Sequence, residues 1–226
     1  MSLLEIYGAK KTEFEVYEKL LLEWNQKINL TAITEHKDIE TKHFLDSLTP
    51  LEYRDFKNKY VIDVGTGAGF PGLPLKIAVP EIRLCLMDSL NKRINFLNEV
   101  TDALKLENVD CVHSRAEDGA RDKKYREKFD IAISRAVAAL NVLAEYDLPF
   151  VKAGGEMIAL KGPSAFDEIK QAEKAIKTLG GEISDVKETE LSGTDLKHTI
   201  VFIKKIKATP AVNPRKATKI SKNPIL

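Results

Sequence analysis

The pattern of hydrophobic and polar positions divides the chain into a helical N-terminal part and a longer part in which strands and helices alternate. Apolar residues recur at helical spacing over residues 11–30, and a second helical stretch covers residues 37–48. Residues 60–64 then form a short apolar run that is typical of a buried strand. We therefore expect a change of architecture near Pro50, which follows the second helical stretch.

Strands and helices alternate along the chain from there to residue 179. This order predicts parallel β-α-β units and an α/β fold with a doubly wound, mostly parallel sheet. The last two strands are joined through a turn at Gly193, so we expect an antiparallel final strand. The tail contains three prolines without periodicity, which predicts a loop. The expected strands cover residues 60–64, 83–87, 109–113, 129–134, 156–160, 183–191 and 199–205, and the later helices cover residues 90–104, 140–151 and 165–179.

The net charge of +1 conceals an uneven distribution of charged side chains. Residues 204–226 contain seven basic and no acidic side chains, which leaves 28 basic against 34 acidic side chains in residues 1–203. A basic tail on an acidic body is typical of contact with a polyanion, but a solvated terminus has the same pattern. Charge alone leaves both interpretations open.

Composition excludes several classes of protein. With 43% hydrophobic and 31% charged residues, the chain has the profile of a folded globular protein. No apolar stretch is long enough to span a bilayer, and the N-terminus lacks the pattern of a secretory signal. Cys85 and Cys111 are expected to be free thiols in a reducing environment, which favours a cytoplasmic location. We expect no metal site, because metal-ligand spacing is absent from the four histidines: His36, His43, His113 and His198.

The most informative segment is the glycine-rich turn of residues 65–72, which follows the first strand of the alternating part. Glycines allow positive φ angles and let the backbone approach a ligand closely. Pro71 fits the first turn of the helix that follows. Asp88 ends the next strand, about 20 residues further on, where an acid is expected to bind ribose hydroxyls. Together these features predict a nucleoside cofactor at the carboxyl edge of a parallel sheet.

The form of this turn favours S-adenosylmethionine over NAD. Gly67 and Gly72 fit the G-x-G-x-x-G dinucleotide pattern, which is a weak signal by itself. Asp63 stands directly before the turn and gives a D-x-G-x-G-x-G sequence that resembles the first motif of methyltransferases. Its negative charge suits a cationic methionine moiety better than a pyrophosphate.

Together with this turn, further stretches of the chain resemble the glucose-inhibited division protein B family, bacterial methyltransferases acting on guanine N7 of small-subunit ribosomal RNA. The resemblance follows the family order over nearly the whole chain. It departs from the family pattern at Lys42, where arginine is usual, and in the tail at Asn213, Ala217 and Thr218. The matching stretches are Trp24-Asn25, Ile28-Asn29-Leu30-Thr31, His43-Phe44-Leu45-Asp46-Ser47-Leu48, residues 63–75, Asp88-Ser89-Leu90-Asn91-Lys92-Arg93, Ser114-Arg115-Ala116-Glu117, Ser134-Arg135-Ala136-Val137-Ala138, Lys161-Gly162 and Pro214-Arg215-Lys216.

The resemblance implies a class I, Rossmann-like methyltransferase domain at residues 51–206, with an N-terminal helical extension at 1–50 and a basic C-terminal tail at 207–226. The implied cofactor is S-adenosylmethionine, and the implied partner is small-subunit ribosomal RNA within the ribosomal subunit. We expect the enzyme to be a monomer. The expected cofactor contacts are Gly65, Gly67, Phe70, Asp88, Ala116, Glu117 and Arg135, and the expected RNA contacts are His43, Arg93, Lys161, Arg215 and Lys216.

Plainer roles are open for several of these side chains. Glu117 has the position of an acid in the first turn of a helix, and Arg135 could be its structural partner. His43 and Asp46 lie three residues apart on one helical face, as a helix pair or as a cap on the cofactor cleft. Lys161 could belong to an ordinary solvated face.

The implied chemistry requires no general base, because guanine N7 has a lone pair and no proton. In-line placement and desolvation of the two reactants can then drive the transfer. The fourth strand ends in Ser134-Arg135-Ala136, not in the Asn/Asp-Pro-Pro-aromatic sequence used on exocyclic amines, and no Pro-Cys nucleophile is present. We therefore name no catalytic residue. The alternatives are a methyltransferase of a small molecule or protein, an RNA-binding module with a vestigial cofactor fold, and an NAD-dependent dehydrogenase.

Overall fold

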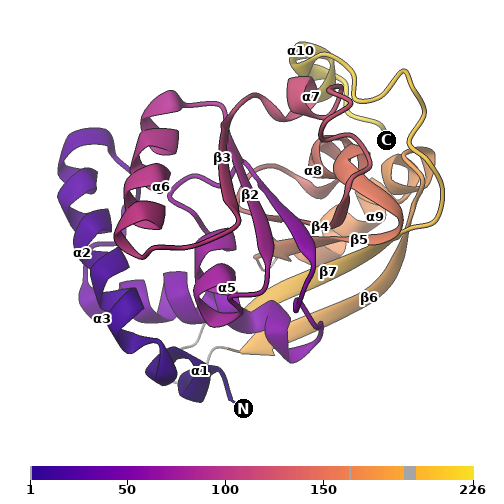
Figure 1. The fold of residues 1–226 in the computed structure, drawn as a ribbon. Helices are drawn as coiled ribbons and strands as arrows, with labels where there is room; N and C mark the ends of the chain where they lie inside the picture. Colours follow the sequence, from indigo (N-terminus) through magenta and orange to yellow (C-terminus); the bar gives the residue numbers. More distant parts are fainter. Residues whose placement is uncertain (1, 163, 191–196) are drawn as a thin grey trace.

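A seven-stranded sheet forms the centre of the computed structural model, which describes residues 2–162, 164–190 and 197–226 (Figure 1). The strand order is β3-β2-β1-β4-β5-β7-β6. The first five of these strands are parallel, and β7 pairs antiparallel with both β5 and β6. The doubly wound sheet and its antiparallel final strand are thus confirmed. The strands are β1 (Tyr60–Val64), β2 (Arg83–Asp88), β3 (Val109–His113), β4 (Phe129–Arg135), β5 (Val151–Lys161), β6 (Gly181–Glu190) and β7 (Lys197–Lys205).

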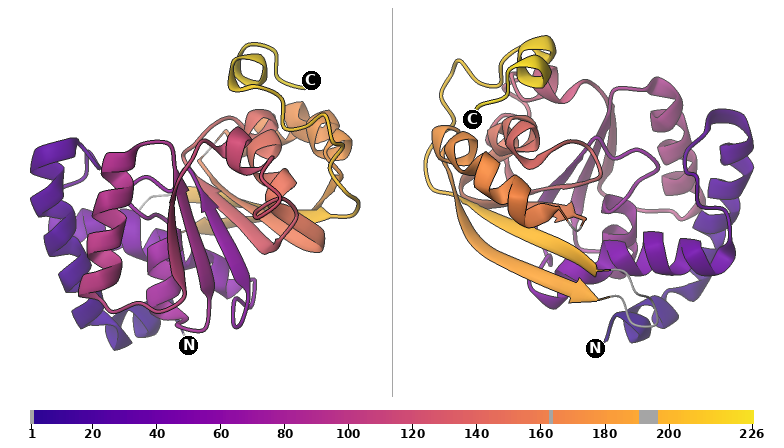
Figure 2. Two further views of the ribbon diagram at one scale, coloured as in Figure 1. Left: turned by 45° about the horizontal axis from the view of Figure 1, so that its top comes forward. Right: turned by 180° about the vertical axis from the view of Figure 1, so that it is seen from behind.

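Helices cover both faces of the sheet and create two hydrophobic cores (Figure 2). Successive strand residues alternate between the cores: Val61 joins the core that contains α1, α2, α5 and α6, whereas Ile62 joins the core that contains α8 and α9. The helical segments are α1 (Leu3–Ala9), α2 (Lys11–Ile28), α3 (His36–Ile39), the π-helix η1 (Glu40–Leu45), α4 (Asp46–Leu48), η2 (Thr49–Glu52), α5 (Gly72–Ala78), α6 (Asn91–Ala103), α7 (Ala116–Gly119), α8 (Leu140–Asp147), η3 (Leu148–Phe150), α9 (Ala165–Thr178) and α10 (Ala217–Lys222).

The N-terminal helices pack onto the sheet domain through a shared core. Phe14 and Tyr17 of α2 are fully buried in the same cluster as Phe96 of α6. The domain boundary expected at residue 50 falls inside η2. Helix α1 was not predicted from the hydrophobic pattern, and it begins with a reciprocal capping box between Ser2 and Glu5.

The structure corrects two element boundaries and one loop predicted from the sequence. The helix expected to reach residue 151 ends at Asp147, and Pro149 lies in the short 3-10 helix η3 that follows. Strand β5 already begins at Val151, which pairs with Phe129 of β4, and the register of this pairing shifts between Phe129 and Ile131. The tail is not all loop, since Ala217–Lys222 forms α10 and buries Ile220. The expected turn at Gly193 lies outside the described residues.

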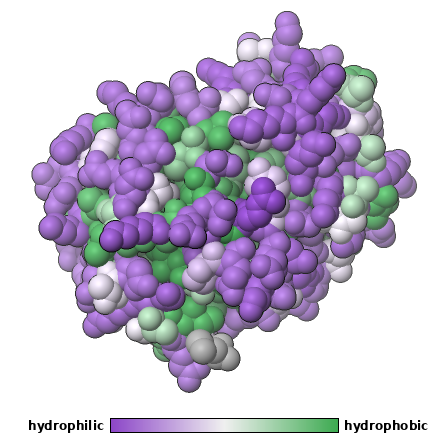
Figure 3. Space-filling model, in the orientation of Figure 1, coloured by the Kyte–Doolittle hydropathy of each residue, from purple (hydrophilic) through white to green (hydrophobic). Residues whose placement is uncertain are grey.

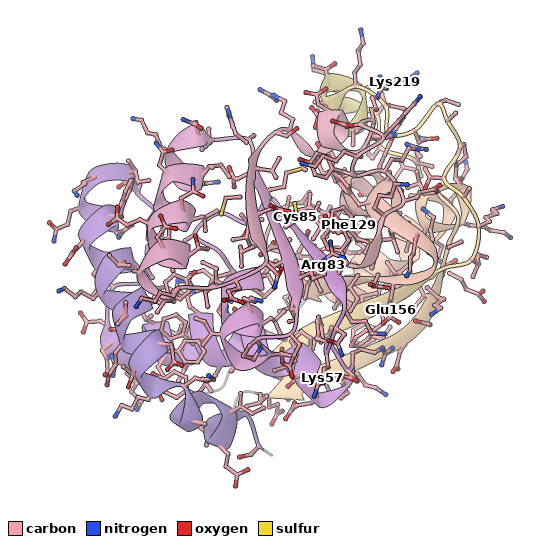
Figure 4. All side chains as sticks on the ribbon, in the orientation of Figure 1. Lys57, Arg83, Cys85, Phe129, Glu156 and Lys219 are labelled. Carbon is pink, nitrogen blue, oxygen red and sulfur yellow. The ribbon has the colours of Figure 1, made fainter. Side chains whose placement is uncertain are left out.

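Both cysteines are free thiols, as the sequence predicted. Cys85 lies within the sheet, where burial raises the pKa of its thiol to about 12 (Figure 4). Burial likewise raises the pKa of the free thiol of Cys111 to about 11. Within the described ranges, none of the helices has the length and apolar character needed to cross a membrane.

Candidate active site

The glycine turn between β1 and α5 is held in shape by Asp63, the last but one residue of β1. The Asp63 side chain is fully buried, and its Oδ2 accepts hydrogen bonds from the Thr66 hydroxyl and the Gly72 amide, each at 2.8 Å. Its Oδ1 has no hydrogen-bond partner among the described residues. Burial raises the pKa of Asp63 to about 7. Asp63 therefore supports the turn from behind and does not line the cavity that the turn borders.

Three glycines of this turn, Gly65, Gly67 and Gly69, have positive φ angles, which residues with a side chain rarely adopt. Gly65 and Gly67 have φ angles of +69° and +61°. A Cβ atom at Gly65 would lie 3.1 Å from the Val137 side chain, so a larger residue would crowd this part of the cleft. The turn thus presents bare backbone to a ligand.

Asp88 lies where the sequence placed the ribose-binding acid, at the end of β2. Its carboxylate accepts hydrogen bonds from the Gly67 amide at 3.0 Å and from the Leu90 amide at 2.9 Å. The Arg93 guanidinium also contacts it at 3.2 Å. Arg93, which was predicted to contact RNA, therefore lies beside the acid that was predicted to bind the cofactor.

A cleft of about 190 Å³ opens between the ends of β1, β2 and β4. Gly65, Asp88, Ala116 and Glu117, four of the seven predicted cofactor contacts, line it. Bare glycine backbone at one end and a buried carboxylate in the wall are the two features that the sequence predicted for the site of a nucleoside cofactor. Tyr146 of α8 and Ala217 of the tail complete the wall, and nothing in the sequence pattern pointed to either.

A second cavity of about 410 Å³ lies on the other side of residues 135–137. Arg135 and Ala136 face this cavity, whereas Val137 faces the 190 Å³ cleft. The second cavity is also lined by His43, His198 and Lys161. The segment from Arg135, the last residue of β4, to Val137 thus borders both cavities at the carboxyl edge of the sheet.

An ionic network centred on Asp46 forms part of the second cavity. Arg135 Nη1 lies 2.6 Å from Asp46 Oδ2, and His198 Nδ1 lies 2.5 Å from Asp46 Oδ1. Burial opposes ionisation of Asp46, but the hydrogen bonds and positive charges of His198 and Arg135 hold its pKa below the ordinary value. Arg135, a predicted cofactor contact, is therefore fixed by a neighbouring carboxylate beside the turn.

His43 links this network to the glycine turn. Its ring stacks on Phe70 at a centroid distance of 4.4 Å, and the Arg135 guanidinium lies 5.0 Å from the same Phe70 ring. Burial, together with the charge of Arg135, lowers the pKa of His43 to about 4. The neutral ring accepts from Arg135 at Nδ1 and hence donates from Nε2 to the Thr31 hydroxyl at 2.7 Å.

The tail is anchored to α8 by a buried carboxylate. Glu145, only 1% exposed, accepts hydrogen bonds from the Asn213 side chain and from the backbone and guanidinium of Arg215. Arg215 is thus engaged inside the protein, whereas Lys216 is exposed. Lys219 lies beyond it on α10, at the edge of the molecule (Figure 4). The surface around α10 is predominantly hydrophilic (Figure 3).

The predicted RNA contacts do not form one exposed surface. His43 and Lys161 line the second cavity, and Lys161 pairs with Glu168 at 2.7 Å, leaving 9% of its side chain exposed. Arg93 and Arg215 pair with buried acids. Their contact with RNA stays a prediction. No group of three or more potential metal ligands occurs in the part of the chain that the structure describes.

Solved structures with this fold include methyltransferases. TYW2 from M. jannaschii in complex with AdoMet gives a TM-score of 0.56 at 16% identity and covers 72% of this chain and 76% of that chain. A mutant 16S rRNA (adenine(1408)-N(1))-methyltransferase from Catenulisporales acidiphilia, with the cosubstrate SAM, gives a TM-score of 0.55 at 16% identity, over 69% and 88% of the two chains. These similarities support the class I methyltransferase fold.

Sequence relatives are much closer. Proteins named ribosomal RNA small subunit methyltransferase G are 56% identical in Clostridium botulinum (strain Alaska E43) and 57% identical in Alkaliphilus oremlandii, each over 98% of this chain and 93% of the relative. The family model described as rRNA small subunit methyltransferase G matches residues 10–197. The methyltransferase family and fold confirm S-adenosylmethionine as the expected cofactor. The resemblance predicted from the motifs is thereby confirmed, and the chain belongs to the rRNA small subunit methyltransferase G family.

Proposed function

We propose that this protein transfers the methyl group of S-adenosylmethionine to N7 of a guanine in small-subunit ribosomal RNA. The observation that carries the proposal is the pair of cavities on either side of residues 135–137. One has the bare glycine backbone and the acid suited to the cofactor. The other, of about 410 Å³, has room for a single base taken out of its stack.

In this proposal one cavity binds the cofactor and the other binds the target base. S-adenosylmethionine supplies an electrophilic methyl group. Gly65 and Asp88 would hold it on one side, and Arg135 and Ala136 border the space for the base on the other. Because guanine N7 carries a lone pair and no proton, the protein needs to orient the base and exclude water, and no side chain has to remove a proton.

The neutral state of His43 is compatible with a target base bound in the second cavity. A neutral ring stacked on Phe70 adds no positive charge next to a base that becomes cationic when N7 is methylated. Arg135 carries its charge beside Asp46, which offsets it. We also propose that the reaction takes place in the cytoplasm, on the ribosomal subunit, and that the chain acts as a monomer.

Methyl-labelled S-adenosylmethionine and small ribosomal subunits that lack the native modification test this proposal. Label is expected at one guanine, mapped by cleavage at N7-methylated positions. Asp88→Ala should abolish labelling by removing the acid of the cofactor cleft, whereas Asp118→Ala, at an exposed acid of α7 that lines neither cavity, should label normally. Tight cofactor binding without any labelled RNA would refute the proposal and favour a small-molecule or protein substrate.

A further inference from the structure

Asp46 and His198 form a pair in the second cavity to which the methyl-transfer scheme above gives no role toward the substrate. They lie 152 residues apart in the chain, on α4 and β7, and meet through the 2.5 Å contact between Asp46 Oδ1 and His198 Nδ1. The Asp46 side chain is 1% exposed, whereas 24% of the His198 side chain is exposed at the cavity. A buried carboxylate thus fixes the orientation of a partly exposed imidazole.

The hydrogen bond leaves the other ring nitrogen of His198 for a ligand. Within the described ranges, no side chain or backbone group forms a hydrogen bond with His198 Nε2. The hydrogen bond to Asp46 raises the pKa of His198, while burial and the charge of Arg135 oppose this rise. In the protonated ring, both nitrogens carry hydrogen, so Nε2 is a donor.

The other basic side chains of the cavity are already engaged. Both ring nitrogens of His43 have partners, Arg135 Nη1 and Asp46 form an ion pair, and Lys161 donates to the Ala138 carbonyl and pairs with Glu168. Lys42 lies 2.8 Å from Asp38. His198 is therefore the described basic side chain of this cavity best placed to bind a base.

We propose that His198, oriented by Asp46, recognises the target base by donating a hydrogen bond from Nε2 to guanine O6. The inference rests on the proposed function and names the group that selects its substrate. O6 and N7 are neighbouring acceptors on one edge of guanine, so a donor at O6 leaves N7 available to the methyl group. Adenine carries an amino group at that position, which is a donor and cannot accept a hydrogen bond from His198 Nε2. The site would therefore reject adenine.

The carboxylate makes this arrangement compatible with the reaction. Methylation gives the guanine ring a positive charge, which an isolated imidazolium beside O6 would oppose. Asp46 contacts both His198 and Arg135, so it reduces the charge that these two groups place beside the base from two positive units to one. Asp46 is a positioning residue in this scheme, and His198 touches the substrate.

Nucleotide binding to the full chain saturated with S-adenosylhomocysteine tests the inference. Guanosine 5′-monophosphate is compared with 2-aminopurine riboside 5′-monophosphate, which keeps N7 but carries hydrogen in place of O6. The wild-type protein should prefer the guanine nucleotide by about 10- to 100-fold, as expected for a hydrogen bond to a charged donor. His198→Phe should abolish the preference. His36→Phe, which removes an imidazole paired with Glu18 outside both cavities, should keep it.

A second measurement separates recognition from a merely structural effect. In the wild-type protein, the ring resonances of His198 should shift with the guanine nucleotide and not with the 2-aminopurine nucleotide. The preference should decline as pH rises through the raised pKa of His198, and in Asp46→Asn it should decline at lower pH, because the carboxylate no longer stabilises the protonated ring.

Two results would overturn the inference. One is an equal loss of affinity for both nucleotides in His198→Phe, which would indicate contact with the phosphate. The other is an unchanged preference for guanine in that variant. If the wild-type protein labels no ribosomal guanine, the proposed function fails, but the nucleotide comparison still decides whether His198 selects the base.

Discussion

Replacing Arg215 with alanine should loosen the tail and weaken cofactor binding together. The Arg215 guanidinium makes three hydrogen bonds of 2.6 to 3.0 Å to the carboxylate of Glu145, which is 1% exposed. The alanine variant keeps two donors to Glu145, the Arg215 backbone amide and the Asn213 side chain. A buried carboxylate would thus remain without its counter-ion.

The cost can be bounded from these contacts. Removing one partner of a buried ion pair destabilises a protein by about 3–5 kcal/mol. The two retained donors reduce this, so we expect a loss of about 2–3 kcal/mol at pH 7. Arg215 holds the pKa of Glu145 below its ordinary value against the opposing effect of burial, so the native contribution is present at neutral pH and is lost as pH falls through that lowered pKa. The difference between the two proteins should therefore shrink in acid.

The expected loss of cofactor affinity follows from Ala217, which lies two residues after Arg215 and lines the cleft. When the tail loosens, the Ala217 methyl group should leave its place in the wall of the cleft. Losing one methyl group from an apolar contact costs about 0.8 kcal/mol, or a roughly fourfold rise in the Kd for S-adenosylmethionine. Urea unfolding and calorimetric titration measure the two effects. Lys216→Ala, at the neighbouring exposed residue, serves as the control. Equal stability and equal affinity in the two variants would refute this account of the tail.

Two substitutions at the glycine turn test its internal support. Gly72→Ala should destabilise the protein by about 1–3 kcal/mol, because the new Cβ would lie 2.7 Å from Leu86 and 2.8 Å from Asp63 Oδ2, and thermal unfolding measures this. A variant with wild-type stability would show that the turn can relax. Asp63→Asn should change the pH dependence of stability. Because burial raises the folded-state pKa of Asp63 to about 7, the wild type should lose stability relative to the variant as pH rises from about 4 to about 7, by up to about 1.4 kcal/mol per unit. Parallel curves from urea unfolding would contradict the assignment.

The fold, and the position of the cleft proposed for the cofactor, followed from local signals in the sequence. The apolar strands, the glycine turn and the acid at the end of the next strand are each encoded within a few residues, and Asp88 indeed ends β2 beside the Gly67 amide. Parallel topology then brings the ends of β1, β2 and β4 to one edge. This explains why four of the predicted contacts line the cleft.

The second cavity could not be predicted from the sequence, because it is formed by contacts between residues far apart in the chain. Asp46 was noted within a family-matching stretch and for its helical spacing from His43, but nothing paired it with His198, which lies 152 positions away and belongs to no motif. The partners of Arg93 and Arg215 were equally hidden. A basic residue in the sequence does not show whether its partner is solvent, RNA or a buried acid, and here both lie against carboxylates. The buried role of Glu145 likewise requires the tail to fold back on α8.

The most direct test of the central claim replaces N7 itself. Small subunits are assembled with 7-deazaguanine at the guanine mapped by labelling, so that a C–H group stands at position 7 while O6 and the ring shape remain. We predict that these subunits accept no methyl group from S-adenosylmethionine, whereas control subunits with ordinary guanine are methylated. Both kinds of subunit should bind the protein equally well. Methyl transfer to the deaza-substituted subunits at that nucleotide would contradict attack by N7.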